Sequence, residues 1–371
     1  MAGIYIHIPF CAKRCIYCGF FSTVRQEEAA RYVQAVCREL ELRKNYLEGA
    51  PVKTVYFGGG TPSRLTPEQI GQIIDSISGT FGLDSLEELT VECNPDDITP
   101  QYVAALRSMG VYRISMGVQT FNDALLHFLN RRHTSAQALE AVRICRESDI
   151  TNISIDLMYG LPGQILDMFR TDLQTAISTG VQHISSYCLS FEDNTPLQKL
   201  RDQGKLTPAD DDLCSQMYTL MCNTLREGGF EHYEISNFCR PGYHSRHNSS
   251  YWDGTPYLGL GAAAHSYNGT SRSWNPSDLD TYMQGIENDD LQFEVEHLSA
   301  ADIYNEKIML SLRTAQGLNL SALSPQDSLS VMQSAESLIS NGSLQFEDNH
   351  LRIPESRMFI SDTIISTLFK D

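Results

Sequence analysis

Residues 4–20 read IYIHIPFCAKRCIYCGF, and this stretch decides how the rest of the chain is interpreted. A short apolar run at 4–8 leads directly into Cys11, Cys15 and Cys18. Cysteines this close together make strained disulfide partners, whereas thiolates are soft ligands that suit zinc or an iron–sulfur cluster. Structural zinc takes four protein ligands, and a four-iron cluster usually takes four thiolates. The loop therefore predicts a metal centre with one open coordination position.

The Cys-x3-Cys-x2-Cys spacing resembles that of the radical S-adenosylmethionine (SAM) superfamily, and an aromatic residue before the third cysteine, here Tyr17, is also typical of it. The resemblance implies a 4Fe–4S cluster on the three cysteines, with the fourth iron free for the amino and carboxylate groups of SAM. The alternative is a zinc site that a distant Cys or His completes.

The composition is that of an ordinary globular protein. The 371 residues are 42% hydrophobic and 20% charged, and the formal net charge of −18 argues against a broad nucleic-acid surface, which needs Lys and Arg to neutralise phosphates. We find no apolar run of transmembrane length and no secretory signal. Ten cysteines, mostly scattered, indicate a reducing compartment, so we expect a cytoplasmic protein.

Short apolar segments alternate with helical patterns through the first 200 residues. The predicted strands are 4–8, 52–57, 89–92, 112–118, 153–157 and 183–189, and the helices between them are 27–48, 66–77, 99–109, 135–148 and 168–179. Such alternation predicts parallel strands joined by right-handed crossovers. Six units are too few for an eight-stranded barrel, so the pattern fits either a three-quarter barrel or an open doubly wound sheet.

Conspicuous polar residues follow the predicted strands, where ligands bind in parallel α/β folds. The cysteines follow the first strand and a Gly58–Thr61 turn follows the second; Glu92, Gln119 and Asp156 lie at the ends of the next three. Each has a structural alternative, such as a tight turn or a capped loop. Their occurrence at one predicted edge favours a shared site, in which Glu92 suits an ammonium and Asp156 the hydroxyls of a ribose.

Five motifs resemble the oxygen-independent coproporphyrinogen oxidase-like family of radical SAM proteins, in register from residue 4 to about 270: YIHIPFCxxxCxYC, FGGGTPS, VECNP, GVQTF with NRRH, and SIDLMYGLPGQ. The resemblance implies a partial barrel of six strands and six helices, with Cys11, Cys15 and Cys18 on the cluster. The positions that match the family's SAM contacts are Tyr5, Gly59, Gly60, Thr61, Glu92, Gln119, Arg131 and Asp156.

Two departures argue against the oxidase branch of that family and its decarboxylase activity. The oxidases carry a fourth cysteine two residues after the third, where this chain has Phe20, and an N-terminal extension, where only four residues precede Tyr5. The oxidase, or a radical SAM enzyme with another substrate, remains the alternative.

The segment 247–252 reads HNSSYW and resembles the His-Asn-x-x-Tyr-Trp signature of the family's heme chaperone branch. That resemblance implies heme binding and delivery of heme to respiratory or other heme proteins. We expect heme contact near His247, because histidine ligates heme iron and aromatic faces pack on a macrocycle. His7, His244 and His265 are competing ligands, and a purely structural loop is the alternative.

The pattern changes after a Gly- and Ala-rich stretch at 257–265, which predicts a turn. Helices are predicted at 299–317 and 327–340, a hairpin across 343–353 and a last helix over 354–369. This order predicts a smaller helical, winged-helix-like domain, and its sparse Lys and Arg favour protein docking or a lid over DNA binding. The predicted divisions are the barrel at 1–235, a connecting segment at 236–295 and the C-terminal domain at 296–371.

Overall fold

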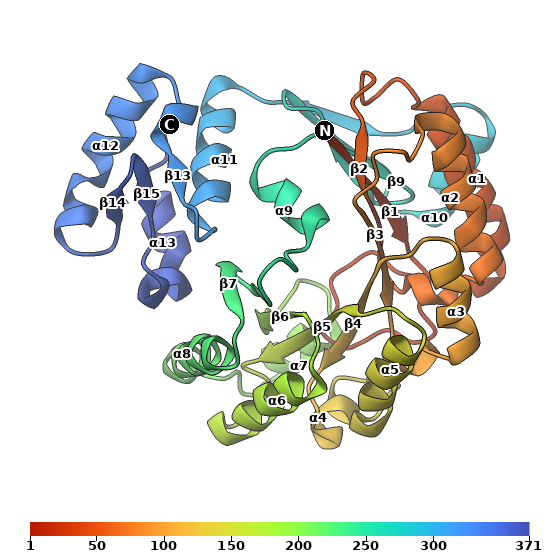
Figure 1. The fold of residues 1–371 in the computed structure, drawn as a ribbon, viewed down its shortest axis with the longest axis horizontal. Helices are drawn as coiled ribbons and strands as arrows, with labels where there is room; N and C mark the ends of the chain where they lie inside the picture. The colour runs from red at the N-terminus through yellow and green to blue at the C-terminus, as the bar shows by residue number, and fades with distance from the viewer. Residues whose placement is uncertain (371) are drawn as a thin grey trace.

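The computed structural model describes residues 1–370, and Asp371, the last residue of the predicted C-terminal domain, lies outside them. Six parallel strands pair in chain order and form the centre of a curved sheet (Figure 1). All six predicted strands are confirmed. They are β1 (Ala2–Ile8), β2 (Val52–Gly59), β3 (Glu88–Cys93), β4 (Arg113–Gln119), β5 (Asn152–Tyr159) and β6 (His183–Cys188).

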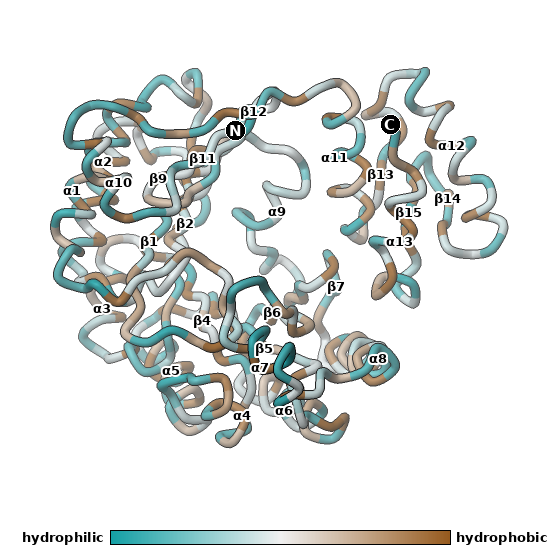
Figure 2. Tube along the Cα trace, turned by 180° about the vertical axis from the view of Figure 1, so that it is seen from behind, coloured by the Kyte–Doolittle hydropathy of each residue, from teal (hydrophilic) through white to brown (hydrophobic). Residues whose placement is uncertain are grey.

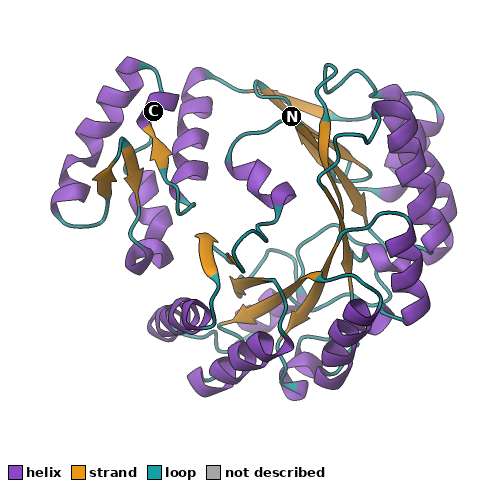
Figure 3. Cartoon of the chain, in the orientation of Figure 1, coloured by secondary structure: helices purple, strands orange, loops and turns teal. Residues whose placement is uncertain are grey.

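Helices cover the convex side of this sheet, whereas a doubly wound sheet carries helices on both faces (Figures 1 and 3). This arrangement confirms the partial barrel. The helices are α1 (Ala29–Leu42), α2 (Pro67–Phe81), α3 (Pro100–Ser108), α4 (Asp123–Phe128), α5 (Ser135–Glu147), α6 (Leu166–Thr179), α7 (Pro196–Asp202) and α8 (Asp211–Glu227), with short 3-10 turns at Gln26–Glu28, Pro62–Arg64 and Pro95–Asp97. Hydrophobic and hydrophilic residues alternate along them in Figure 2, as expected of helices with one buried face.

Side-chain alternation in β1 separates the core from the inner face of the barrel. Ile4, Ile6 and Ile8 are fully buried in the core that the outer helices share. Tyr5 and His7 occupy the alternate positions and therefore point to the concave side. The residues predicted to begin the second helix do so: Thr66 and Gln69 form a capping box around Pro67. The first helix is shorter than predicted, because α1 ends at Leu42 and turns follow it.

The sheet extends beyond the six predicted strands at both edges. At one edge β9 (Tyr257–Leu260) runs parallel to β1, and β10 (His265–Tyr267), β11 (Ser271–Trp274) and β12 (Glu294–His297) follow in antiparallel order. At the other edge β8 (Asn237–Cys239) pairs with β6, and β7 (Glu231–Glu234) pairs with β8. The predicted turn at 257–265 is therefore wrong in its first half. This strand contains Gly259, and glycine is depleted in strands.

α10 (Leu279–Glu287) packs beside α1 on the barrel, at the right of Figure 1. The elements after β12 form the C-terminal part, at the left of Figure 1. They are α11 (Ala300–Leu312), β13 (Leu318–Asn319), a 3-10 turn at Leu320–Ala322, α12 (Pro325–Ser340), β14 (Gln345–Glu347), β15 (His350–Arg352), a 3-10 helix at Glu355–Ile360 and α13 (Ser361–Ser366). The predicted hairpin is confirmed as β14–β15, to which β13 adds a third strand. The predicted last helix is confirmed in its second half as α13, whereas its first half is a 3-10 helix.

The predicted division of the chain at 235 and 295 stays a prediction. The segment 236–295 does more than connect, because it contributes β8 to β11 to the barrel sheet. Within residues 1–370, none of the helices combines the length and the apolar composition that crossing a bilayer requires.

A buried ion pair fastens the added strands to α1. Glu39 and Arg43 are both buried, with 3.1 Å between Oε1 and Nη1. Arg43 also donates to the Gly259 carbonyl (3.0 Å) and to Ser266 Oγ (3.0 Å). Glu39 accepts the Gly261 amide, the Tyr282 hydroxyl and the Asn275 amide, each at 2.8 Å. One carboxylate thus holds α1, β9 and α10 together.

We expect Glu39→Ala to lower the free energy of unfolding by roughly 3–5 kcal/mol, because it leaves the Arg43 guanidinium buried without its carboxylate partner. Anaerobic urea denaturation followed by circular dichroism measures the change. Glu41→Ala, on the exposed side of the same helix where Glu41 pairs with Arg38, is the matched control and should change stability by less than about 1 kcal/mol. Equal effects of the two substitutions would contradict the fastening role.

Candidate functional site

A cavity of about 700 Å³ opens at the carboxyl ends of the parallel strands. Ten residues predicted from the sequence line it together: Cys11, Cys15, Cys18, Gly59, Gly60, Thr61, Glu92, Gln119, Arg131 and Asp156. They come from β2 to β5 and the loops after β1, β2 and β4, and parallel pairing brings these strand ends to one edge. The structure therefore brings these ten residues around one cavity.

The cysteine loop is tied down at its start and leaves its three thiols facing the cavity. The Cys11 amide donates to the Thr23 carbonyl (2.8 Å), and the Thr23 amide donates to the Pro9 carbonyl (2.7 Å). Cys11 Sγ lies 3.4 Å from Thr61 Oγ1, and Arg131 Nη1 lies 3.4 Å from Cys15 Sγ. Burial raises the pKa of the Cys11 and Cys18 thiols, so their thiolates need a cationic partner such as a metal.

The spacing of the three sulfurs distinguishes the two predicted kinds of metal centre. Thiolates on one tetrahedral zinc ion lie about 3.8 Å apart, given a Zn–S bond of about 2.3 Å. Among the described residues, the loop does not form a group of three ligand atoms that all lie within 4.8 Å of one another. At least one pair of the three sulfurs therefore lies more than 4.8 Å apart, wider than thiolates on one zinc ion, and the cavity that they line has room for a polynuclear iron–sulfur cluster.

The Gly58–Gly60 turn gives the cavity a wall made of backbone. Gly59 has φ +110°, and a Cβ there would lie 2.6 Å from the His7 ring. A Cβ on Gly60 would lie 2.7 Å from the Pro9 carbonyl oxygen. Any side chain at these two positions would collide with β1 or the loop that follows it. The same two glycines therefore permit both the tight turn and a close approach of the backbone to a ligand.

Two half-buried carboxyl groups, Glu92 and Asp156, face the cavity from β3 and β5. Burial raises the pKa of Glu92 to about 7, although the Tyr56 hydroxyl donates to its Oε1 at 2.7 Å. Burial likewise raises the pKa of Asp156 to about 6, against the opposing effects of Ser185 and Arg113. Each carboxyl loses hydration without a full ion pair, so a bound cation or a donor group would stabilise its charged form.

Arg131 and Gln119 complete the side of the cavity nearest the cysteine loop. Arg131 donates to Asn94 Oδ1 (2.8 Å) and to the Gly117 carbonyl, while its Nε is buried without a protein partner. Gln119 adopts φ +70°, unusual for a residue with a side chain. Arg132, the neighbour that the sequence alone does not distinguish from Arg131, pairs instead with Asp96 and Asp97.

Sequence reasoning missed Arg113 on β4. Its side chain is fully buried, and Nε and Nη1 have no hydrogen-bond partner in the described chain. The guanidinium favours the charged forms of both Glu92 and Asp156. The available signal was the alternation 113, 115, 117, 119, because Ser115, Gly117 and Gln119 all line the cavity.

Tyr5 does not line the cavity but supports its floor. Its ring stacks on Tyr56 with centroids 6.2 Å apart, and a Cβ on Gly58 would lie 2.9 Å from it. The Tyr5 hydroxyl lies 3.2 Å from His7 Nδ1. The predicted contact of Tyr5 with a ligand would therefore be made through Gly58 and its neighbours rather than directly.

His247 lies away from the cavity, inside α9 (Arg246–Trp252), which occupies the concave side of the sheet (Figure 1). It is 0% exposed, with Nδ1 2.8 Å from Thr54 Oγ1 and Nε2 2.9 Å from the Tyr251 hydroxyl. Burial lowers its pKa to about 3. The structure does not support heme ligation by His247, because both ring nitrogens are already bonded and neither reaches a cavity. The segment is a helix rather than the structural loop of the alternative, and the His247 ring bonds side chains.

Comparison with known proteins identifies the family of the chain. The Radical SAM superfamily profile matches residues 5–176, and the HemN C-terminal domain profile matches residues 298–359. A heme chaperone HemW of Mycobacterium tuberculosis is 34% identical over 99% of this chain and 94% of its own length. The chain belongs to the HemW heme chaperone family. Another HemW, of Bacillus subtilis, is 35% identical and covers 86% of this chain and 85% of itself.

The HemW relationship is accompanied by a close structural likeness. The coproporphyrinogen III oxidase HemN of Escherichia coli superimposes with a TM-score of 0.84 over 100% of this chain and 90% of its own, at 22% identity. At that identity the likeness shows the fold alone. It agrees with the partial barrel and the C-terminal domain described above.

We expect Glu92→Gln to become more stabilising as the pH rises. The folded protein keeps a proton on Glu92 up to about pH 7, whereas the unfolded chain releases it near the ordinary value of 4.5. The folded state therefore binds more protons in this window, and the wild type loses stability as pH rises through it. Between about pH 5 and pH 8 the stability difference between variant and wild type should grow by roughly 2–3 kcal/mol. Urea denaturation at several pH values measures it, with Glu41→Gln as the exposed control; a difference that does not change with pH would contradict the raised pKa.

Proposed function

We propose that the protein is a heme chaperone, which binds heme and delivers it to heme proteins, on a scaffold that holds a 4Fe–4S cluster and SAM. The observation that carries this proposal is the similarity to HemW heme chaperones over 99% of the chain. Phe20 supports the same conclusion. It is 69% exposed and lines the cavity where the resemblance places a fourth cysteine in the oxidases.

In this proposal Cys11, Cys15 and Cys18 hold the cluster and leave one iron open. The fit rests on the wide spacing of three cavity-facing thiols. When bound, such a cluster supplies an electron to SAM. Arg131 lies against Cys15, where its charge offsets that of the thiolates.

The other cavity residues suit the parts of SAM. Glu92 accepts from the ammonium group, and a cation there would bring its raised pKa back down. Arg131 pairs with the carboxylate, and Gln119 is placed beside it. Asp156 accepts from the ribose hydroxyls. The Gly59–Gly60 backbone and Thr61 contact the methionine portion, with Tyr5 supporting them from below.

The proposed partners are heme and client heme proteins, which include respiratory and membrane-associated proteins. The proposal gives the C-terminal part a docking or lid role, because it faces the concave side of the barrel (Figure 1). The cytoplasmic location inferred from the cysteine content stays a prediction.

We expect Cys15→Ala to lose its iron and acid-labile sulfide while keeping its fold, because two thiolates leave the cluster short of ligands. Iron and sulfide analysis with circular dichroism, on protein reconstituted without oxygen, measures both. Cys37→Ala removes a half-buried cysteine on α1 and is the matched control. Full iron and sulfide content in Cys15→Ala would contradict the cluster assignment.

The test of the function itself compares turnover with heme binding. The reconstituted protein is given SAM, a reductant and coproporphyrinogen III, and an active oxidase is assayed in parallel. We expect the oxidase to form protoporphyrinogen IX and this protein to form none. The same preparation should bind hemin with a Soret band and pass it to an apo heme protein. Conversion of coproporphyrinogen III would instead favour the oxidase reading despite Phe20.

A further inference from the structure

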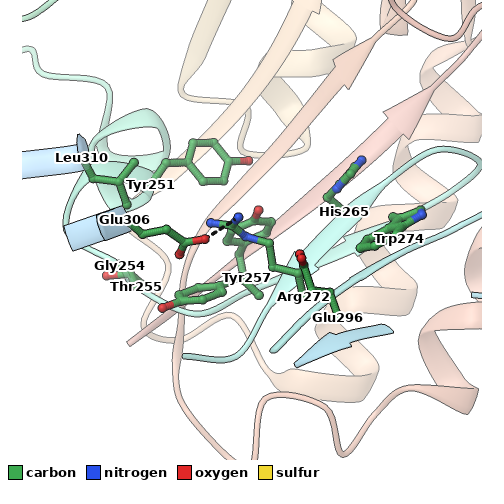
Figure 4. A pocket seen from close by; sticks show the side chains of 11 residues that line it. Tyr251, Gly254, Thr255, Tyr257, His265, Arg272, Trp274, Glu296, Glu306 and Leu310 are labelled. Atoms are coloured by element: carbon green, nitrogen blue, oxygen red, sulfur yellow. Dashed lines mark ion pairs between the residues drawn. The ribbon is translucent and has the colours of Figure 1, made fainter. Parts of the chain in front are cut away.

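A second cavity, of about 470 Å³, lies on the inner face of the strands added beyond β1 (Figure 4). Its walls come from β9, β10, β11 and β12, from α9 through Tyr251 and from α11 through Glu306 and Leu310. Its volume is in the range of small-molecule sites. Tyr5 pairs with Gly259, so this inner face continues that of β1, whose end carries the cysteine loop.

Strand register gathers aromatic and basic side chains on this face. Tyr257 pairs with Tyr267, Tyr267 with Arg272, and His265 with Trp274. Side chains of directly paired residues lie on the same face of a sheet, so all of them line the cavity. This wall offers flat aromatic surfaces for a planar ligand and one guanidinium for an acidic group.

His265 is the residue that distinguishes this cavity. The side chain is exposed, and neither ring nitrogen has a hydrogen-bond partner among residues 1–370. Its ring stacks on Trp274 with centroids 5.8 Å apart and 25° between the planes. No other histidine of the described chain lines either cavity. A neutral imidazole whose ring nitrogens have no hydrogen-bond partner can coordinate iron.

We propose that this second cavity is where heme binds, with His265 as the iron ligand, Trp274 and the tyrosines against the macrocycle and Arg272 facing a propionate. The proposal rests on the proposed heme chaperone function and moves the ligand from His247 to His265. It gives the HNSSYW segment a different part: His247 anchors α9 through Thr54 and Tyr251, and Tyr251 forms the wall of the cavity.

The charges of the cavity connect heme binding to the contact between the barrel sheet and α11. Arg272 Nη1 pairs with Glu306 Oε1 of α11 at 2.6 Å, as Figure 4 shows, and Glu296 lines the same space. The two carboxylates repel a propionate, whereas the Arg272 guanidinium attracts it. A propionate of heme therefore replaces Glu306 as the partner of Arg272. Loss of this ion pair loosens the contact between the barrel sheet and α11.

Anaerobic hemin titration of the full-length protein tests the site. His265→Ala should weaken hemin binding by about tenfold or more and alter the Soret band. His265→Met, which still offers a ligand atom, should retain binding with a shifted spectrum. The matched control is His297→Ala, an exposed histidine of β12 that follows Glu296 and so points to the opposite face. Wild-type affinity and spectrum in His265→Ala would overturn the site.

Glu306→Gln provides a readout that a merely structural role would not produce. It frees Arg272 and removes a negative charge, so hemin should bind several-fold more tightly, whereas Arg272→Gln should weaken binding without changing the ligand spectrum. Weaker binding in Glu306→Gln would overturn the exchange. Absence of hemin binding by the wild type would overturn the chaperone function, and this site with it, whereas wild-type binding that His265→Ala leaves unchanged overturns the site alone.

Discussion

The pairing of β1 with a parallel strand on each side is the constraint on which both cavities depend. Ile4, Ile6 and Ile8 are fully buried against the outer helices, which forces Tyr5 and His7 to the concave face. β2 on one side ends in the glycine turn of the first cavity, and β9 on the other begins the wall of the second. A shift of β1 by one residue would reverse its faces and separate the cysteine loop from the backbone that receives it.

Charge burial is the second theme of the inner face. Glu92 and Asp156 keep raised pKa values because burial outweighs their hydrogen bonds, and Arg113 opposes the effect without pairing with either. Such groups cost stability in the free protein. A ligand that brings a cation and hydroxyl groups relieves that cost on binding. The ion pair of Glu39 and Arg43 has the opposite role, because its partners are all within the protein and none remains for a ligand.

The parts that were predictable are those with local signals. Segments of four to seven residues alternating with helical patterns predicted β1 to β6. Residues that follow strand ends predicted nine of the side chains and glycines around the first cavity, and the family resemblance added Arg131. The strands β9 to β12, of three or four residues each, were not predicted. The role of Arg113 was not predicted, because the sequence of a strand does not show whether an arginine in it is buried or exposed.

His247 and His265 show which properties the sequence predicts and which need the tertiary structure. From the sequence both are histidines in aromatic surroundings, and a motif favoured the first. By itself the sequence determined the cysteine loop, the six strand–helix units and the family, because cysteine spacing, periodicity and motifs are properties of contiguous residues. Only the tertiary structure decided which histidine has free nitrogens, which carboxylates are buried and that a second cavity exists, because burial and hydrogen bonding depend on residues brought together from β2, α9, β10 and α11.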